Sequence, residues 1–292
     1  MSGVNYSGEL RVLVAEWPVN PFFNLAFEEA LYLEARCPTL RFWRNDKAIV
    51  IGRFQCPALE VNALEARRLG VKLVRRFTGG GAVYHDLGNL NYALTLPDYR
   101  LDMEKSFELV GEAVADALGS IGVNDVHYRP LNDVEVGGLK ISGMAASRSR
   151  DRVFVHGALL VSSDLSTLWA VLKTSREKLS DKKFTESRVK RVTTLSDVLG
   201  RSVDVRDLLG MMAEAIADKL GLRASWSEVH GSELERALSL YEEKYSRLEW
   251  NLALVDELRD LINEEEMDAL REIATPSLDQ RKVVEGVKPW VG

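Results

Sequence analysis

The sequence predicts an α+β fold in which a central mixed, largely antiparallel β-sheet is flanked by helices. Two observations favour this class. Predicted strands and helices follow one another without the strict alternation of a doubly wound sheet. Several predicted strands are joined by short turns, as antiparallel neighbours are. A length of 292 residues with 46% hydrophobic residues provides for one large domain with a sizeable core.

Each element has a local signal. Asn20 followed by Pro21 is typical of a helix N-terminus, because asparagine caps the first turn and proline is tolerated at its first position. Gly70 closes a helix, and Gly137-Gly138 forms a hairpin turn. Apolar residues at helical spacing predict helices at 22–36, 61–69, 104–121, 165–172, 205–220 and 231–245. Short apolar or alternating segments predict strands at 9–16, 39–43, 47–52, 71–75, 82–84, 90–96, 134–136, 139–141 and 153–161.

The end of the chain differs in composition from the rest. From Asn251 the sequence keeps a helical period, is rich in glutamate and aspartate, and reaches Thr275-Pro276 before a polar tail. We expect a domain of residues 1–250 and a helical C-terminal extension of residues 251–292. The extension is either a docking segment or a surface helix followed by a frayed end.

The composition excludes several classes of protein. A net charge of −6 and a pI near 5.5 argue against a nucleic acid as the main partner. No apolar stretch has the length that spans a membrane, and the N-terminus shows no secretory signal. The two cysteines, Cys37 and Cys56, cannot form a disulfide framework or a zinc cluster, so we expect a cytoplasmic protein.

The segment from Arg75 to Asp86 is the first that points to chemistry. Two arginines end a predicted strand, and three glycines, Gly79 to Gly81, precede the next strand. Glycines let a ligand approach the backbone, successive N–H groups bind anions, and arginines add donors that suit phosphate or carboxylate. The pattern is neither a P-loop nor a dinucleotide fingerprint. It predicts a loop that holds an anionic ligand, the alternative being a flexible hairpin turn.

A second segment places a lysine beside a glycine turn. Strand alternation puts Leu139 and Ile141 on one face and Lys140 and Ser142 on the other. Lys140 is then either a solvated edge charge or a point charge aimed at the anion of the glycine loop.

Other polar side chains lie near these segments in the sequence. Asn132 and Asp133 either start the hairpin or bind a nucleotide and Mg²⁺ through their side-chain oxygens. His156, followed by Gly157, lies inside an apolar predicted strand. It is either a core histidine with satisfied hydrogen bonds or a catalytic base.

Taken together, these segments resemble lipoate–protein ligases of the biotin/lipoyl ligase superfamily. The resemblance rests on RRFTGGGAVYHDLGN, NDVEVGGLKISGMA, VHGALLVSSDL, KLSDKKFTESRVKRVTTLSDVL, IGRFQCPALEVN at residues 51–62, and EWN at Glu249–Asn251. The segments stand in the order of the family and span most of the chain, from about Asn24 to Asn251. The resemblance implies the fold that this superfamily shares with class II aminoacyl-tRNA synthetases, with residues 1–250 as the catalytic domain.

The resemblance implies an ATP-dependent, AMP-forming ligase. The carboxylate of lipoate attacks the α-phosphorus of ATP, which gives lipoyl-AMP and pyrophosphate. A lysine of an acceptor protein then attacks the acyl carbon and releases AMP. The implied ligands are lipoate, ATP and Mg²⁺. The implied acceptors are the lipoyl domains of 2-oxo-acid dehydrogenases and the glycine-cleavage H protein.

Functional residues of the family correspond by motif to positions of this sequence. Lys140 is the expected catalytic residue, which binds the carboxylate and the α-phosphate, and Asp133 is expected to hold Mg²⁺. Loss of one preorganised donor typically costs about 10²–10³ in rate. The residues expected to bind lipoate and ATP are Arg76, Gly79, Gly80, Gly81, Ala82, Val83, His85, Asn89, Asn132, Asp133, Lys140, Ser142, Gly143, His156 and Gly157.

Departures from the family pattern separate the alternatives. Related octanoyl- and lipoyl-transferases use a cysteine nucleophile, and neither Arg129–Asn132 nor Gly143–Gly157 contains one. Cys56 is interpreted as a packing residue. This favours ligation over ATP-independent octanoyl or lipoyl transfer. The retained lysine, arginines and glycines argue against a non-catalytic lipoyl-binding homologue. Biotin ligation would require a different glycine- and arginine-rich loop. Met144 and Ala146 stand where the family more often has Ser and Gln.

The resemblance also bears on the C-terminal extension. Full-length ligases carry an accessory domain that promotes adenylation, and the residues after Asn251 do not resemble it. Either a separate small accessory subunit supplies this function or the acidic helical tail replaces it.

Overall fold

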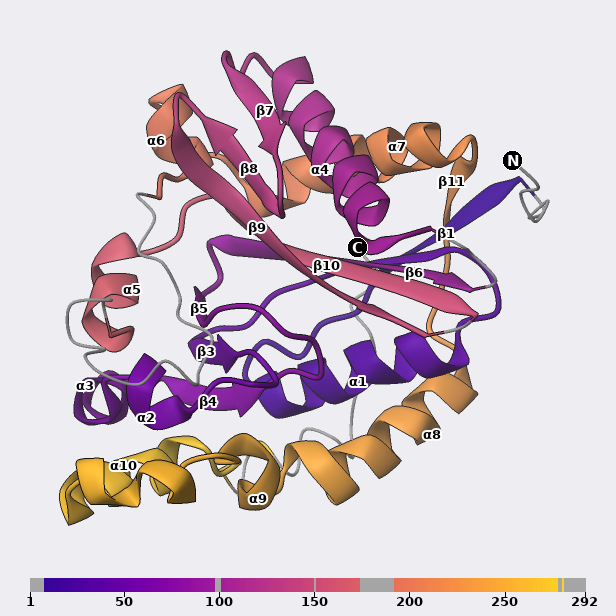
Figure 1. Cartoon of the computed structure of the whole chain (residues 1–292). Coiled ribbons are helices and arrows are strands. Elements are labelled where there is room, and N and C mark those ends of the chain that lie inside the picture. Colours follow the sequence, from indigo (N-terminus) through magenta and orange to yellow (C-terminus); the bar gives the residue numbers. More distant parts are fainter. Residues whose placement is uncertain (1–7, 98–100, 150, 174–191, 278–279, 281–292) are drawn as a thin grey trace.

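Two β-sheets organise the residues that the computed structural model describes, which are 8–97, 101–149, 151–173, 192–277 and 280 (Figure 1). The larger sheet consists, in spatial order, of β11 (Arg223–Trp226), β1 (Glu9–Val14), β2 (Thr39–Trp43), β6 (Asn89–Pro97), β10 (Arg152–Leu160), β9 (Leu139–Arg148), β8 (Asp133–Val136) and β7 (Val126–Arg129). The smaller sheet consists of β4 (Lys72–Arg75), β3 (Ala48–Ile51) and β5 (Val83–His85).

Strand pairing in the larger sheet is mixed. β1 runs parallel to both of its neighbours, whereas every pair from β2 to β7 is antiparallel. In the smaller sheet, β3 is parallel to β4 and antiparallel to β5. The predicted α+β class with a mixed, largely antiparallel sheet is therefore confirmed.

Helices cover both faces of the larger sheet (Figure 1). On one face, α4 (Met103–Ser120) and α7 (Leu209–Leu220) pack on a core that includes Val12, Phe42 and Tyr92. On the other face, α1 (Pro21–Glu34) lies between the sheet and α8 (Gly231–Leu240). The remaining helices are α2 (Pro57–Glu60), α3 (Ala63–Arg68), α5 (Leu165–Val171), α6 (Leu195–Leu199), α9 (Leu248–Asn251), α10 (Glu264–Ile273) and the short turns of helix Val205–Leu208, Tyr241–Tyr245 and Asp256–Leu261.

Helix α1 begins as the sequence predicts. The Asn20 side chain accepts a hydrogen bond from the Phe23 N–H at 3.0 Å, and Pro21 occupies the first turn. The helix is buried almost all round because it is covered by the sheet on one side and by α8 on the other. Its polar residues Asn24 and Glu28 are consequently removed from solvent.

In two cases, strands that the sequence predicts to be joined by a short turn lie in different sheets. β2 belongs to the larger sheet and β3 to the smaller one, and β5 and β6 are divided in the same way. The short edge strands β7 and β11 were not predicted. Their residues are exposed or half-buried, so they lack the apolar run that marks the interior strands.

The segment after Asn251 is helical in two separate pieces. Leu254 has a φ of +72°, and the chain turns there before a short helical segment and α10. Asn263 caps α10 by accepting from the Glu266 N–H at 2.9 Å. The apolar face of α10 packs beside α3 in the core around the smaller sheet, and this face consists of Met267, Ala269, Leu270 and Ile273.

Parts of the predicted elements lie outside the described residues. These are the first part of KLSDKKFTESRVKRVTTLSDVL, at positions 178–191, and nearly all of the polar tail after Pro276. Among the described residues, no helix combines the length and the apolar character needed to cross a bilayer.

Candidate functional site

A cavity of about 230 Å³ lies between the larger sheet, the smaller sheet and α1. Eleven of the predicted site residues line it, together with residues that were not predicted. The predicted residues in its wall are Arg76, Gly81, Ala82, Val83, His85, Asn132, Asp133, Lys140, Gly143, His156 and Gly157.

The floor of the cavity is one face of four adjacent strands. In register across β2, β6, β10 and β9 lies the row Trp43–Asn91–Ala158–Gly143. All four residues of this row line the cavity. The next row on the same face is Arg41–Ala93–His156–Ala145. Residues far apart in the sequence therefore meet here because sheet pairing aligns them.

A β-bulge turns Lys140 into the cavity. Glu135 pairs with Lys140 but Val134 pairs with Ser142, so β9 carries one extra residue at this point. The simple alternation that put Lys140 and Ser142 on one face is therefore wrong. Lys140 lines the cavity together with Gly143, and a β-carbon on Gly143 would collide with the Lys140 ammonium.

The Lys140 ammonium forms an ion pair with Asp133, with 2.8 Å between Nζ and Oδ1. The lysine side chain is 26% exposed, whereas Asp133 is almost fully buried. Burial lowers the pKa of Lys140 to about 8; the Arg76 guanidinium acts in the same direction and Glu135 opposes it. The residue therefore carries a positive charge at neutral pH in a place of low solvation.

Arg76 shapes the glycine loop. Its guanidinium donates to the carbonyls of Gly79 and Gly81 at 2.6 and 2.8 Å, and to the Val50 carbonyl at 3.1 Å. Burial lowers the pKa of Arg76 to about 10, so the group stays charged. Sequence reasoning assigned this fork to the ligand, but the structure shows its donors on the loop backbone. Arg76 therefore adds a positive charge to the cavity wall and gives the loop its shape.

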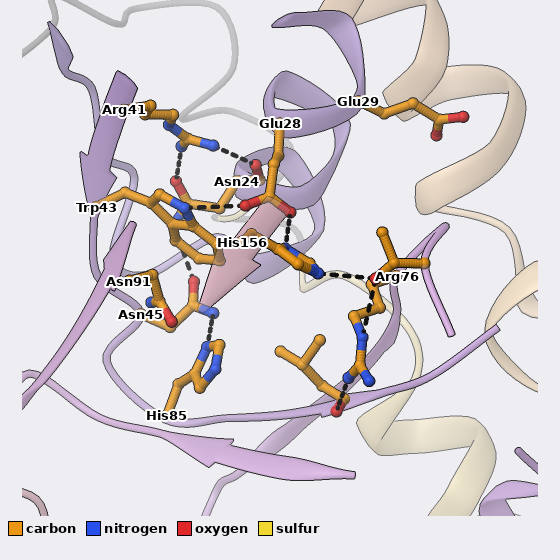
Figure 2. A network of polar contacts seen from close by, with 12 residues as sticks. Asn24, Glu28, Glu29, Arg41, Trp43, Asn45, Arg76, His85, Asn91 and His156 are labelled. Atoms are coloured by element: carbon orange, nitrogen blue, oxygen red, sulfur yellow. Dashed lines mark hydrogen bonds and ion pairs between the residues drawn. The ribbon is translucent and has the colours of Figure 1, made fainter. Parts of the chain in front are cut away.

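A chain of hydrogen bonds runs from Arg76 to Glu28 (Figure 2). Arg76 Nε donates to Thr78 Oγ1 at 3.1 Å, Thr78 Oγ1 lies 2.7 Å from His156 Nε2, and His156 Nδ1 lies 2.8 Å from Glu28. The Trp43 indole donates to the other Glu28 oxygen at 3.1 Å. The Glu28 carboxylate accepts from His156 Nδ1–H, so a neutral His156 accepts at Nε2 from the Thr78 hydroxyl, which itself accepts from Arg76. Glu28, fully buried, thus orients His156 and Thr78 and supplies negative charge beside Arg76.

A second chain runs from Arg41 to His85 (Figure 2). Arg41 donates to Asn24 Oδ1 at 2.7 Å, Asn24 Nδ2 donates to Asn45 Oδ1 at 2.8 Å, and Asn45 Nδ2 lies 3.3 Å from His85 Nδ1. Burial, with the Arg76 and His156 side chains, lowers the pKa of His85 to about 3. His85 is therefore neutral and packs edge-on against the Trp43 ring, with 5.8 Å between the ring centroids.

Four predicted residues do not line the cavity. Ser142 lies 2.9 Å from the Tyr92 hydroxyl and donates to the Ala158 carbonyl, and Asn89 donates to Asn91 at 2.9 Å. Gly79 and Gly80 belong to the loop but not to the wall.

Sequence reasoning missed Glu28, Trp43, Asn45, Thr78 and Asn91. One signal was present for the helix. Glu28 follows Asn24 by one helical turn in an otherwise apolar segment, and polar side chains on the buried face of a helix need partners. Nothing in the sequence marks the others, because their roles depend on cross-strand neighbours.

Cys56 is a packing residue in the structure. It lies in the core around the smaller sheet, and its thiol donates to the Leu254 carbonyl at 3.4 Å. Burial raises the pKa of the thiol. Both properties suit an inert side chain rather than a nucleophile.

The cavity wall combines an ion pair with apolar side chains. Lys140 and Asp133 lie at one end of the floor, and Leu25, Trp43 and Val50 line the cavity with them. An ammonium and apolar side chains in one wall suit an elongated ligand with an anionic end.

Comparison with known proteins identifies the family. Residues 20–217 match the model of the lipoyl protein ligase A/B catalytic domain, and the chain therefore belongs to this family. It is 36% identical over 262 residues to lipoate-protein ligase A subunit 1 of Thermoplasma acidophilum, an alignment that covers 85% of this chain and 98% of that protein. The family predicted from the sequence is confirmed.

Solved structures of similar proteins support the same family. A lipoate protein ligase of T. acidophilum with bound lipoic acid is 31% identical, with a TM-score of 0.73 over 84% of this chain and 100% of that chain. A bipartite lipoate protein ligase, studied with its E2 lipoyl domain from the same organism, is 34% identical, with a TM-score of 0.75 over 84% and 97%. A lipoate-protein ligase A bound with ATP is 32% identical, with a TM-score of 0.74 over 84% and 99%.

Proposed function

We propose that this chain is an ATP-dependent lipoate–protein ligase that converts lipoate to lipoyl-AMP and transfers the lipoyl group to a lysine of an acceptor protein. The observation that carries the proposal is the Lys140 ammonium, which faces a cavity beside the glycine loop and is paired with Asp133. The similar proteins named for lipoate and ATP support it.

Lys140 would act on the adenylation step. A lipoate carboxylate oxygen attacks the α-phosphorus, pyrophosphate leaves, and negative charge grows on the phosphoryl oxygens. A fixed ammonium in a poorly solvated place stabilises that charge more in the transition state than in the ground state. In the second step, the acceptor amine attacks the acyl carbon, loses a proton, and AMP leaves with the former bonding pair. The protein needs no covalent nucleophile of its own.

The remaining residues have roles in binding under this proposal. The loop Gly79–Val83, held by Arg76, would place backbone N–H groups along the phosphates, and Asn132 would contact the nucleotide.

Mg²⁺ fits the chemistry of the charged end. The described residues contain no cluster of three acidic, histidine or cysteine ligands, but Mg²⁺ bound with a nucleotide usually takes one or two carboxylates and phosphate oxygens. Asp133 would hold the ion, which would offset phosphate charge when bound.

Two features of the biological setting follow as part of the proposal. The similar T. acidophilum protein is named as a subunit of a bipartite enzyme, so we propose that a separate accessory subunit completes adenylation here. The expected acceptors are lipoyl domains and the H protein, and the expected location is the cytoplasm.

The alternative of ATP-independent transfer lacks a nucleophile. Cys56 is buried with a raised thiol pKa. The other cysteine, Cys37, lies in the bend before β2, next to Thr39, and does not line the cavity. A non-catalytic homologue would have no need of a buried ion pair between Lys140 and Asp133, which costs desolvation energy.

The test is lipoate-dependent ATP–pyrophosphate exchange, together with the mass of a lipoyl domain incubated with enzyme, ATP and lipoate. We expect exchange and a mass gain, and we expect Lys140→Ala to lower the exchange rate by about 10²–10³. Lys219→Ala is the matched control, because Lys219 forms surface ion pairs with Glu112 and Asp116. No exchange with or without an accessory subunit would overturn the proposal, and acyl transfer without ATP would establish the transferase.

A further inference from the structure

The two ends of the cavity suit the two ends of a carboxylic acid. Lys140 lies over Gly143, at one end of the row Trp43–Asn91–Ala158–Gly143. The opposite end of the row is Trp43, against which His85 packs. A carboxylate held at Lys140 therefore directs its chain along the row toward Trp43.

The length of the row matches the length of the substrate proposed above. Asn91 is two strands away from Gly143, which is about 9.5 Å at the usual spacing of strands. An extended octanoyl chain spans roughly 8–9 Å, since three bonds of an extended chain cover about 3.5 Å. The part of lipoate that differs from octanoate, the dithiolane ring, would then lie beside Asn91 and His85.

Hydrogen-bond direction fixes the tautomer of His85. Asn24 Oδ1 accepts from the Arg41 guanidinium and from the Trp17 N–H, both of which can only donate. The Asn24 amide nitrogen therefore donates to Asn45 Oδ1, and Asn45 donates to His85 Nδ1. A neutral imidazole that accepts at Nδ1 carries its proton on Nε2.

Two donors at this end are unpaired among the described residues. His85 Nε2 and Asn91 Nδ2 have no hydrogen-bond partner there, although His85 is 4% exposed and Asn91 2% exposed. Asn91 Oδ1 already accepts from Asn89. Both side chains line the cavity. Buried donors are nearly always satisfied, so an unpaired pair in a cavity wall calls for an acceptor in the cavity, which a bound ligand can supply.

We propose, resting on the function proposed above, that His85 Nε2–H and the Asn91 amide donate hydrogen bonds to the dithiolane sulfurs and thereby select lipoate over octanoate. Divalent sulfur is a weak acceptor, yet it is the only acceptor type that the distal end of lipoate presents. The alkyl end of octanoate leaves both donors unpaired. A site built to pair with a polar group rejects the analogue that lacks it. Arg41, Asn24 and Asn45 are positioning residues in this proposal.

The first experiment compares the two acids. The ratio of kcat/KM for lipoate to that for octanoate is measured by ATP–pyrophosphate exchange, with the accessory subunit present. We expect His85→Leu and Asn91→Leu each to lower this ratio about tenfold. Val50→Ala is the matched control, because it alters the same apolar end without removing a donor and affects both acids alike.

The outcomes separate this proposal from the proposed function. An unchanged ratio in folded His85→Leu and Asn91→Leu, verified by thermal unfolding, overturns the selection of lipoate while exchange itself persists. Absence of exchange with either acid in the wild-type enzyme overturns the proposed function instead.

The second experiment reads the tautomer directly, without activity. The chain has four histidines, and the spectrum of His85→Leu identifies the His85 signals in ¹⁵N-resolved NMR. We expect the Nε2–H tautomer at neutral pH, and a mixture of tautomers in Asn45→Leu, which removes the donor to Nδ1. A Nδ1–H tautomer or an imidazolium in the wild-type protein would contradict the proposal.

Discussion

Arg75 and Arg76 are consecutive, both are buried, and both place their guanidinium donors on backbone carbonyls, yet they belong to two different regions. Arg75 is directed away from the cavity, into the joint between the smaller sheet and the C-terminal segment. Arg76 is directed into the cavity wall. The difference follows from strand geometry, because successive side chains at the end of β4 leave opposite faces.

The Arg75 region is a joint. Its guanidinium ties the loop after β3 to the segment around α9, and its backbone N–H donates to Asn251 Oδ1 at 3.1 Å. The Asn251 amide in turn donates to the Tyr245 and Ala274 carbonyls. The carbonyls that accept from the Arg75 guanidinium are those of Gly52, Arg53, Gln55, Trp250, Asn251 and Ala253.

The Arg76 region is a template for a loop. Its carbonyl partners lie within the glycine loop and on β3, and its Nε reaches Thr78. Gly80 has a φ of +90°, a conformation that glycine adopts without strain. An arginine beside a glycine loop can thus shape the loop and add charge to a cavity wall while its donors are occupied by the protein.

The largest effect is expected when the joint is broken. Arg75→Lys offers one ammonium in place of a planar fork and leaves several buried carbonyls unpaired, so we expect a loss of about 3 kcal/mol in the free energy of unfolding. Urea unfolding measures this loss. Arg201→Lys, at an exposed position, is the control and is expected to change stability by less than about 0.5 kcal/mol. Equal stability of Arg75→Lys and the wild type would contradict the role of Arg75 in holding these two segments together.

Arg76→Lys is expected to lower activity more than stability, the reverse of Arg75→Lys. A lysine cannot hold Thr78, Gly79 and Gly81 in one arrangement, so the loop loses its preorganised N–H groups. We expect kcat/KM in ATP–pyrophosphate exchange to fall about 10²-fold, with a smaller loss of stability than in Arg75→Lys. If both substitutions lowered stability alike and left the rate per folded molecule intact, the two arginines would have one structural role.

The pH dependence distinguishes the two arginines by charge. Because burial and Arg76 lower the pKa of Lys140 to about 8, kcat/KM is expected to fall about tenfold per pH unit above that value as the ammonium deprotonates. Arg76→Gln removes the like charge near Lys140, so it raises the pKa of Lys140. The descending limb of the plot of kcat/KM against pH then moves to higher pH. Arg75→Gln, whose charge is not among the causes of the shift, is expected to leave the limb in place. A limb that moves equally in both variants contradicts this assignment.

The lowered pKa of Lys140 also makes the stability of the protein depend on pH. The folded protein loses the Lys140 proton at a lower pH than the unfolded chain, where the pKa is near the ordinary 10.5. Between about pH 8 and 10.5 the unfolded chain binds more protons, so the contribution of Lys140 to stability rises with pH over this window. Lys140→Met is expected to remove that rise in urea unfolding.

Motifs located the site in the sequence, but cross-strand geometry determines its details. The glycine loop and the lysine segment were predictable because glycine and lysine have few alternative reasons to stand in those patterns. The bulge that turns Lys140 beside Gly143 was not predictable. Strand alternation alone puts Lys140 on the same face as Ser142. Asn91 and Trp43 escaped notice because their position depends on register between β2 and β6. Both arginines were predicted to serve the anion, whereas strand alternation sends Arg75 away from the cavity and Arg76 into its wall.

The smallest effect concerns the hydroxyl that links Arg76 to His156. Thr78→Val keeps the volume but removes the group that accepts from Arg76 and donates to His156, so we expect kcat/KM to fall about fivefold. Thr78→Ser keeps the hydroxyl and is expected to retain most of the rate. The Arg75 joint is untouched in both variants, so their unfolding should differ from the wild type by about 1 kcal/mol at most. If serine lost as much activity as valine, the methyl contact rather than the hydrogen-bond chain would position Arg76, and the template would depend on packing.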